Sequence, residues 1–88
     1  MVSCTVTVVN ALGLHARAAA RFVKIAGAYR SQVKVGRGSR IVDGKSILGL
    51  LLLAAARGSQ LAISAEGADE ADAVAALCDL ATRGFEDP

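Results

Sequence analysis

Apolar and polar residues alternate along three stretches of the chain, with the period of two that is typical of a strand buried on one face. These stretches cover residues 2–8, 31–35 and 61–65. A fourth, shorter extended run at residues 40–42 follows segment 36–39, whose composition is typical of a turn. The pattern therefore predicts four strands, of which the second and third along the chain form a β-hairpin.

Two further stretches predict helices, the first from apolar residues at the spacing of an amphipathic helix and the second from an apolar run between an N-cap and a stop. The first covers residues 16–26 and ends at Gly27. Its predicted inner face consists of Ala19, Ala20, Val23 and Ala26. The second covers residues 47–56, with Ser46 as its N-cap and Gly58 as its stop.

A last helical stretch follows Asp69, which is predicted to cap it. Its inner stripe consists of Val74, Leu77, Cys78 and Ala81, and Gly84 marks its end. Four strands and three helices in the order βαββαβα predict an α+β domain whose helices pack over one face of the sheet. The length of 88 residues fits one domain that spans residues 1–88.

Composition narrows the possible classes of function. A formal net charge of +2 is too small to attract nucleic acid generally, and 53% apolar residues against 20% charged residues is the balance of a folded globule. The apolar run at 47–56 is too short to cross a membrane, and residues 1–9 lack the pattern of a signal peptide. We therefore expect the chain in the cytoplasm.

The two cysteines, Cys4 and Cys78, lie far apart in the sequence and have no metal-ligand spacing. No metal site is expected. Both cysteines fall on the apolar faces of their predicted elements, so we interpret them as buried reduced thiols, with a disulfide as the alternative.

The single histidine, His15, lies where a loop leads into the first predicted helix. A helix start offers unpaired backbone N–H groups and the positive end of the helix dipole, which both favour an anion. A phosphate on a ring nitrogen of His15 would meet the N–H groups of Ala16 and Arg17 and the forked guanidinium of Arg17. The neutral imidazole is nucleophilic near pH 7, which suits a phosphoryl carrier. A capping or surface histidine is the alternative.

Three segments together resemble the HPr family of phosphotransferase-system carriers: residues 10–17 (NALGLHAR), 44–46 (GKS) and 63–67 (ISAEG). The resemblance covers nearly the whole chain. It implies an open-faced β-sandwich, in which three helices cover one face of a four-stranded antiparallel sheet. His15 would be the phosphorylated residue and Arg17 its phosphate-stabilising neighbour.

The resemblance also implies the partners. An Enzyme I-type kinase that uses phosphoenolpyruvate would phosphorylate His15, and an EIIA-type protein would accept the phosphate, with no cofactor. The chain would then be a monomeric phosphocarrier with a phosphohistidine intermediate, not a stand-alone enzyme. Residues 83–87 and the run at 50–56 look more like the nitrogen-related branch of the family than the sugar-transport branch.

One residue departs from the family pattern, because Ala18 stands where relatives commonly have proline. Proline pre-sets the first helical turn, whereas alanine is a good helix former. We therefore expect the helix to form and the position of the loop at His15 to be the feature affected.

Two roles are open for Ser46. A serine before a helix is fully explained as an N-cap. The position also matches the one that a dedicated serine kinase phosphorylates in many relatives, and a phosphate there would add negative charge to a docking surface.

The apolar helix after Ser46 cannot bury all of its side chains, since adjacent residues diverge by about 100° around a helix axis. We interpret Ile47, Leu48 and Leu51 as a patch that docks a partner, with an ordinary over-hydrophobic helix as the alternative. The family resemblance implies that this helix lies beside the histidine and docks the upstream kinase. Arg21, Lys24 and Lys45 would form a basic rim that attracts an acidic partner, unless they are merely solvated charges.

Other functions have weaker support. Four basic residues, Arg30, Lys34, Arg37 and Arg40, follow the predicted hairpin and suggest a nucleic-acid-binding module, but no aromatic residues interleave with them. A non-catalytic regulatory module is a further alternative. An enzyme with His15 as general base lacks an accompanying carboxylate pair, cysteine nucleophile or metal cluster.

Overall fold

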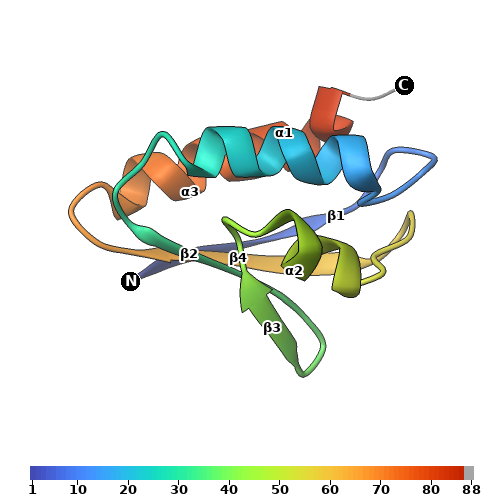
Figure 1. Cartoon of the computed structure of the whole chain (residues 1–88), viewed down its shortest axis with the longest axis horizontal. Coiled ribbons are helices and arrows are strands. Elements are labelled where there is room, and N and C mark those ends of the chain that lie inside the picture. The colour runs from blue at the N-terminus through green and yellow to red at the C-terminus, as the bar shows by residue number, and fades with distance from the viewer. Residues whose placement is uncertain (87–88) are drawn as a thin grey trace.

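The computed structural model describes residues 1–86, which fold in the order βαββαβα (Figure 1). The strands are β1 (Val2–Thr7), β2 (Gln32–Arg37), β3 (Arg40–Asp43) and β4 (Gln60–Glu66). The helices are α1 (Ala16–Ala26), α2 (Ile47–Leu52) and α3 (Glu70–Thr82), followed by the 3-10 turn η1 (Gly84–Glu86).

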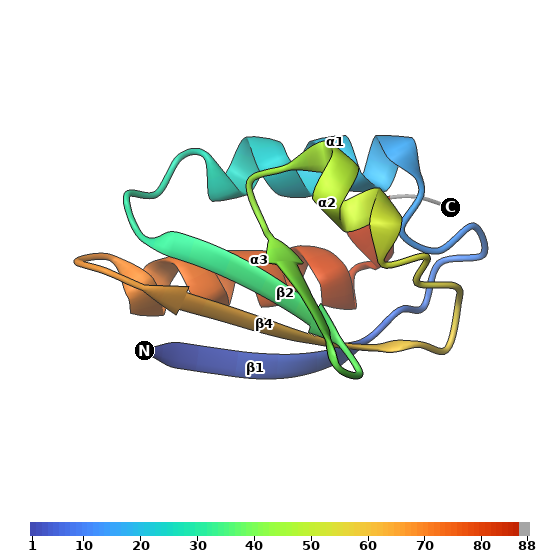
Figure 2. The same cartoon turned by 60° about the horizontal axis from the view of Figure 1, so that its bottom comes forward.

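The strands form one antiparallel sheet in the order β1-β4-β2-β3. The helices lie on one face of the sheet and leave the other face open (Figure 2). Helix α3 packs on β1 and β4, α2 packs beside β3, and α1 contacts both other helices. The predicted α+β architecture, an open-faced sheet covered on one side by three helices, is confirmed.

The alternating positions of the strands become the core under the helices. Val6, Val33, Val35, Leu61 and Ile63 are buried on the covered side of the sheet. The buried face of α1 consists of Ala18, Ala19, Phe22 and Ala26. Ala20, predicted to face inward, is exposed, because residues 18, 22 and 26 follow one another at four-residue steps along a different side of the helix.

Helix α2 is shorter than the sequence pattern predicts. It ends at Leu52, and the predicted continuation to residue 56 and the stop at Gly58 are wrong. Ala54 has a left-handed φ of 50°, which reverses the chain directly after the helix. The reversal brings Ala55 against another loop, so a tertiary contact ends this helix.

The predicted side-chain cap of α3 is also wrong. Asp69 occupies the N-cap position but makes no capping hydrogen bond to its own helix. Its carboxylate accepts from the N–H groups of Arg30 and Ser31, at 2.9 Å each, and from the hydroxyl of Ser31. The side chain therefore ties the start of α3 to the start of β2. These hydrogen bonds, led by that of the Ser31 hydroxyl, lower the pKa of Asp69 to about 2.

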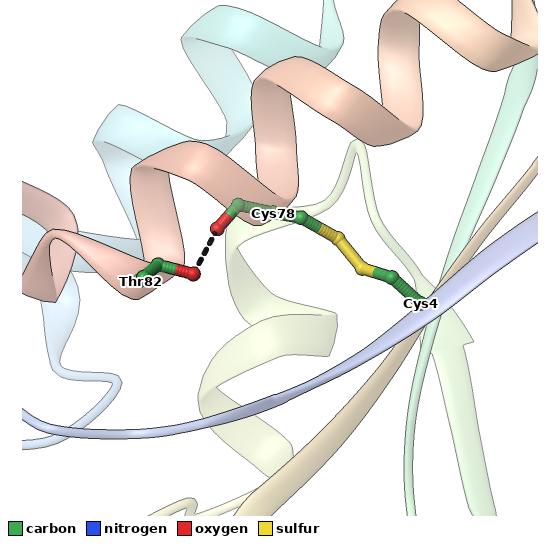
Figure 3. The surroundings of a disulfide bond; sticks show 3 residues. All are labelled: Cys4, Cys78 and Thr82. Carbon is green, nitrogen blue, oxygen red and sulfur yellow. Dashed lines mark hydrogen bonds between the residues drawn. A yellow bond between two sulfur atoms is a disulfide. The ribbon is translucent and has the colours of Figure 1, made fainter.

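The two cysteines form a disulfide, so the interpretation as reduced thiols is wrong in this structure. Figure 3 shows the bond between Cys4 on β1 and Cys78 on α3. Both residues are half-buried at the place where α3 crosses β1. The sequence pattern placed each cysteine on the correct face of its element, but only the packing of α3 on β1 brings them together.

Within the described part of the chain, none of the helices has the length and apolar character needed to cross a membrane.

Candidate phosphorylation site

His15 follows a tight loop that connects β1 to α1. Asn10 begins the loop, and its side-chain amide donates to the carbonyl of Gly13 at 2.8 Å. The N–H of Gly13 donates to the Asn10 carbonyl at 3.1 Å, and the N–H of His15 donates to the Gly13 carbonyl at 3.0 Å. These bonds close two successive turns and fix the backbone that presents His15.

The loop rests on the segment after α2, residues 53–56. The N–H of Leu14 donates to the carbonyl of Ala55 at 2.9 Å. Gly13 has φ +67°, and a Cβ there would come within 2.4 Å of the Ala55 carbonyl oxygen. Glycine is therefore required for this approach of two backbones. Figures 1 and 2 show the two loops side by side at one end of the molecule.

The imidazole of His15 is itself the N-cap of α1. Its Nδ1 accepts a hydrogen bond from the backbone N–H of Arg17 at 3.2 Å, and its own backbone is extended. In the neutral ring an accepting Nδ1 leaves the proton on Nε2. Nδ1 thus carries a lone pair beside the start of a helix. The ring is half-buried, which leaves it accessible to a partner.

Ala16, Arg17 and Ala18 form the first turn of α1. The expectation that alanine at position 18 keeps the helix is confirmed, because Ala18 is helical and fully buried in the core. The side chain of Arg17 is exposed and makes no hydrogen bond or ion pair within residues 1–86. A long exposed guanidinium two residues after His15 is suited to contact a group attached to its ring.

The residues predicted to dock the kinase lie on the outer side of α2. Ile47, Leu48 and Leu51 are 41%, 68% and 37% exposed, whereas Leu50 is fully buried. The single short helix thus divides its apolar residues between the core and the surface. We call the exposed set Ile47, Leu48 and Leu51 the docking patch.

Two exposed apolar residues in the same region were not among the predicted docking residues. Leu52 is 56% exposed at the end of α2, and Leu12 is 72% exposed in the loop before His15. The sequence signal for an exposed Leu12 was its position next to Gly13, in the loop that leads to His15. Exposed apolar side chains thus occur in the loop before His15 and at the end of α2, which leads into the segment on which that loop rests.

The three cations predicted to form a basic rim have different surroundings. Lys24 is exposed on α1. Arg21 donates through Nη1 to the carbonyls of Phe85 and Glu86, at 2.9 Å each, and so holds η1 against α1. Lys45 donates through Nζ to the Tyr29 carbonyl at 2.7 Å. Arg21 and Lys45 therefore have structural contacts in addition to their charge.

Ser46 caps α2 as predicted. Its Oγ accepts from the N–H of Gly49 at 3.0 Å, and its backbone is extended. The residue is half-buried at the edge of the docking patch.

The basic residues of the hairpin do not form a uniform stripe for nucleic acid. Arg37 donates to the carbonyl of Leu53 and Arg40 to the carbonyl of Leu52, at 3.1 and 2.8 Å. Two of the four cations are therefore bound to α2 within the molecule. In the part of the chain described, no group of three or more His, Cys, Asp and Glu side chains is arranged to hold a metal ion.

Comparison with known proteins identifies similar chains. A family model described as PTS HPr component phosphorylation site matches residues 2–83. The phosphocarrier protein HPr of Pseudomonas aeruginosa is 47% identical, over 99% of this chain and 98% of the relative. The phosphocarrier protein HPr of Neisseria meningitidis is 45% identical, over 91% and 90% of the two chains.

Solved structures agree in fold. HPr from Thermoanaerobacter tengcongensis superposes with a TM-score of 0.95 at 40% identity, covering 100% of this chain and 99% of that one. HPr from Bacillus anthracis gives a TM-score of 0.86 at 35% identity, with 91% and 95% coverage. A structure described as an HPr dimer, also from T. tengcongensis, gives 0.72 at 42% identity, with 91% and 92% coverage.

Proposed function

The chain belongs to the HPr family of phosphocarrier proteins of the phosphotransferase system, and we propose that it carries its phosphoryl group on Nδ1 of His15. The observation that supports this atom is the hydrogen bond from the Arg17 N–H to Nδ1. In the neutral ring this hydrogen bond assigns the lone pair to Nδ1 and directs it toward the start of α1. The family consists of phosphoryl carriers, and His15 is the single histidine of this chain.

Transfer requires one bond to form and one to break. The lone pair of Nδ1 gives up the hydrogen bond from the Arg17 N–H and forms a bond to phosphorus, while the bond from phosphorus to the donor breaks and the proton on Nε2 stays in place. Positive charge develops on the ring, and the phosphoryl oxygens carry negative charge. The released Arg17 N–H is then placed to donate to an oxygen of the phosphoryl group that Nδ1 carries.

The side chain of Arg17 provides the second stabilising group in this proposal. It is exposed and has no partner within residues 1–86, so its guanidinium is available to grip two phosphoryl oxygens. The N–H of Ala16 lies in the same first turn of α1 and adds a backbone donor.

We propose that an Enzyme I-type kinase supplies the phosphate and an EIIA-type protein receives it. The docking patch supports this choice, because it exposes apolar side chains on a helix that contacts α1, the helix that His15 caps, and such surfaces are typical of a protein interface. Exposed Lys24 and the charges of Arg21 and Lys45 favour an acidic partner surface. A kinase specific for Ser46 would act at the edge of the same patch. Membership of the nitrogen-related branch of the family stays a prediction.

The carrier function is tested with purified Enzyme I-type kinase and phosphoenolpyruvate. We expect the intact mass to rise by one phosphate that is lost in acid, and no gain in His15→Ala. Arg17→Ala should slow transfer about tenfold or more, because developing charge loses a donor. Arg30→Ala removes an equal charge elsewhere and is the control. Absence of a mass gain in the wild type with an active kinase would refute the proposal.

We also propose that the carrier acts as a monomer in the cytoplasm. A docking patch must stay uncovered to meet two successive partners, which favours the monomer. Light scattering at micromolar concentration tests this, and a mass of twice 9.0 kDa would contradict it.

A further inference from the structure

Two arginines face each other at the tip of the β2–β3 hairpin. Arg37 ends β2, Arg40 begins β3, and the two are direct cross-strand partners. Like charges placed directly opposite each other destabilise a sheet. A pair in this position therefore needs acceptors outside the hairpin to offset the repulsion.

The acceptors are consecutive carbonyls at the end of α2. Nη1 of Arg37 donates to Leu53 at 3.1 Å, and Nη1 of Arg40 donates to Leu52 at 2.8 Å. The last carbonyls of a helix lack partners within it, and α2 has no basic residue in its own last turn. The hairpin thus supplies from outside the cationic donors that commonly satisfy a helix C-terminus.

The capped end of α2 leads directly to the support of the His15 loop. Ala54 reverses the chain at φ 50°, and the carbonyl of Ala55 then accepts the N–H of Leu14 at 2.9 Å. This contact joins backbone to backbone with no side chain between them. A shift of Leu53 would therefore pass to Leu14 and to the residue that follows it.

We propose that Arg37 and Arg40 are positioning residues for phosphoryl transfer. By holding the C-terminal end of α2, they fix both the docking patch and the backbone on which the His15 loop rests. The inference rests on the proposed function, since it takes His15 as the reacting residue and α2 as the docking element. It also gives a role to a basic pair whose spacing alone suggested nucleic acid.

The test compares the double variant Arg37→Gln/Arg40→Gln with the charge-matched control Arg30→Gln/Lys34→Gln. Neither Arg30 nor Lys34 donates a side-chain hydrogen bond to α2 within residues 1–86. With the Enzyme I-type kinase, we expect kcat/KM of the first variant to fall about fivefold or more, through a higher KM and a lower kcat. Arg37→Lys/Arg40→Lys should recover part of the loss, since it keeps two cationic donors.

Hydrogen exchange gives a readout that does not depend on the kinase. Under native conditions, well below the melting temperature, the amide of Leu14 should exchange about fivefold or more faster in the glutamine variant than in the control. If the double variant does not fold, Arg40→Gln alone is measured in the same way. Its hydrogen bond is exposed, whereas that of Arg37 is partly buried, so the single change should disturb the fold less.

The outcomes separate the two proposals. Exchange at Leu14 and kcat/KM equal to those of the control would overturn the positioning role alone. An equal loss in both double variants that vanishes at high salt would assign the effect to charge steering and overturn it as well. A wild-type chain that takes no phosphate would refute the carrier function first, and the positioning role with it.

Discussion

His15 has two roles at once, as a helix cap and as the proposed nucleophile. Serine, threonine, aspartate and asparagine usually accept the N–H at this position of a helix. Here the imidazole does so through Nδ1, at 3.2 Å from the Arg17 nitrogen. The cap therefore orients the ring and selects its tautomer with the same hydrogen bond. A hydroxyl or carboxylate would cap the helix but could not form a phosphohistidine.

Asp69 is a residue whose charge is expected to make stability depend on pH. Its pKa is lowered to about 2 in the folded chain, foremost by the Ser31 hydroxyl and then by the Arg30 N–H. An aspartate with a lowered pKa stabilises the fold above its unfolded pKa, about 4, and this contribution is lost as pH falls toward 2.

Asp69→Asn tests this expectation in urea titrations between pH 2 and pH 6. The variant should unfold more easily than the wild type above about pH 4, and the two curves should converge near pH 2. Asp72→Asn, in the first turn of the same helix, is the charge-matched control. A difference between Asp69→Asn and the wild type that stays constant over this range would contradict the assignment.

Helix α2 is an element of six residues whose two ends are both held by side chains. A helix this short is marginal by itself. Ser46 accepts the N–H of Gly49 at one end, and Arg37 and Arg40 donate to carbonyls at the other. This bracing allows α2 to expose apolar side chains and still keep one conformation.

Ser46→Ala should therefore destabilise the chain by about 1 kcal/mol, through loss of the cap. Thermal unfolding would show this as a melting temperature about 4–8 °C lower, because the domain is small. Ser39→Ala, in the exposed hairpin turn, is the matched control. An unchanged melting temperature in Ser46→Ala would show that the Ser46 cap does not stabilise α2.

Ser46→Asp separates capping from regulation. Aspartate is also a good N-cap, so stability should be close to that of the wild type. Its added negative charge at the edge of the docking patch should weaken binding to the Enzyme I-type kinase, measured at low salt. Equal affinity would leave Ser46 with the capping role alone.

At the scale of the whole molecule, the disulfide joins the first strand to the last helix. Cys4 and Cys78 are separated by 74 residues, so the bond removes much of the freedom of the unfolded chain. A loop of this length corresponds to a stabilisation on the order of 4 kcal/mol in the chain-entropy model. The cytoplasm proposed for this carrier is reducing and rarely keeps such bonds, so this stabilisation applies to the oxidised chain alone.

Thermal unfolding with and without a reducing agent tests the contribution of the bond. Reduction should lower the melting temperature of the wild type by about 10 °C or more, because several kcal/mol are lost from a small domain. Cys4→Ser/Cys78→Ser should melt near the reduced wild type and not respond to the agent. If reduction makes the thiols of the wild type titratable but leaves its melting temperature unchanged, this stabilisation is contradicted.

The sequence by itself determined the elements and the position of the proposed reactive residue. Alternation at 2–8, 31–35 and 61–65 places side chains on one face of a strand whatever the strand pairs with. Helical spacing likewise predicts the helix at 16–26, although packing selected which of its sides is buried. The junction at His15 is equally local, since a helix start exposes its N–H groups wherever the helix lies.

Tertiary structure alone decided the features that join distant segments. Helix α2 ends early at the reversal at Ala54, after which the carbonyl of Ala55 accepts the N–H of Leu14. The carboxylate of Asp69 accepts from Arg30 and Ser31 and does not cap its own helix. The disulfide and the two hairpin arginines on α2 have the same origin. The physical reason is that each local pattern permits several partners, and only packing selects which groups come within hydrogen-bonding or bonding distance.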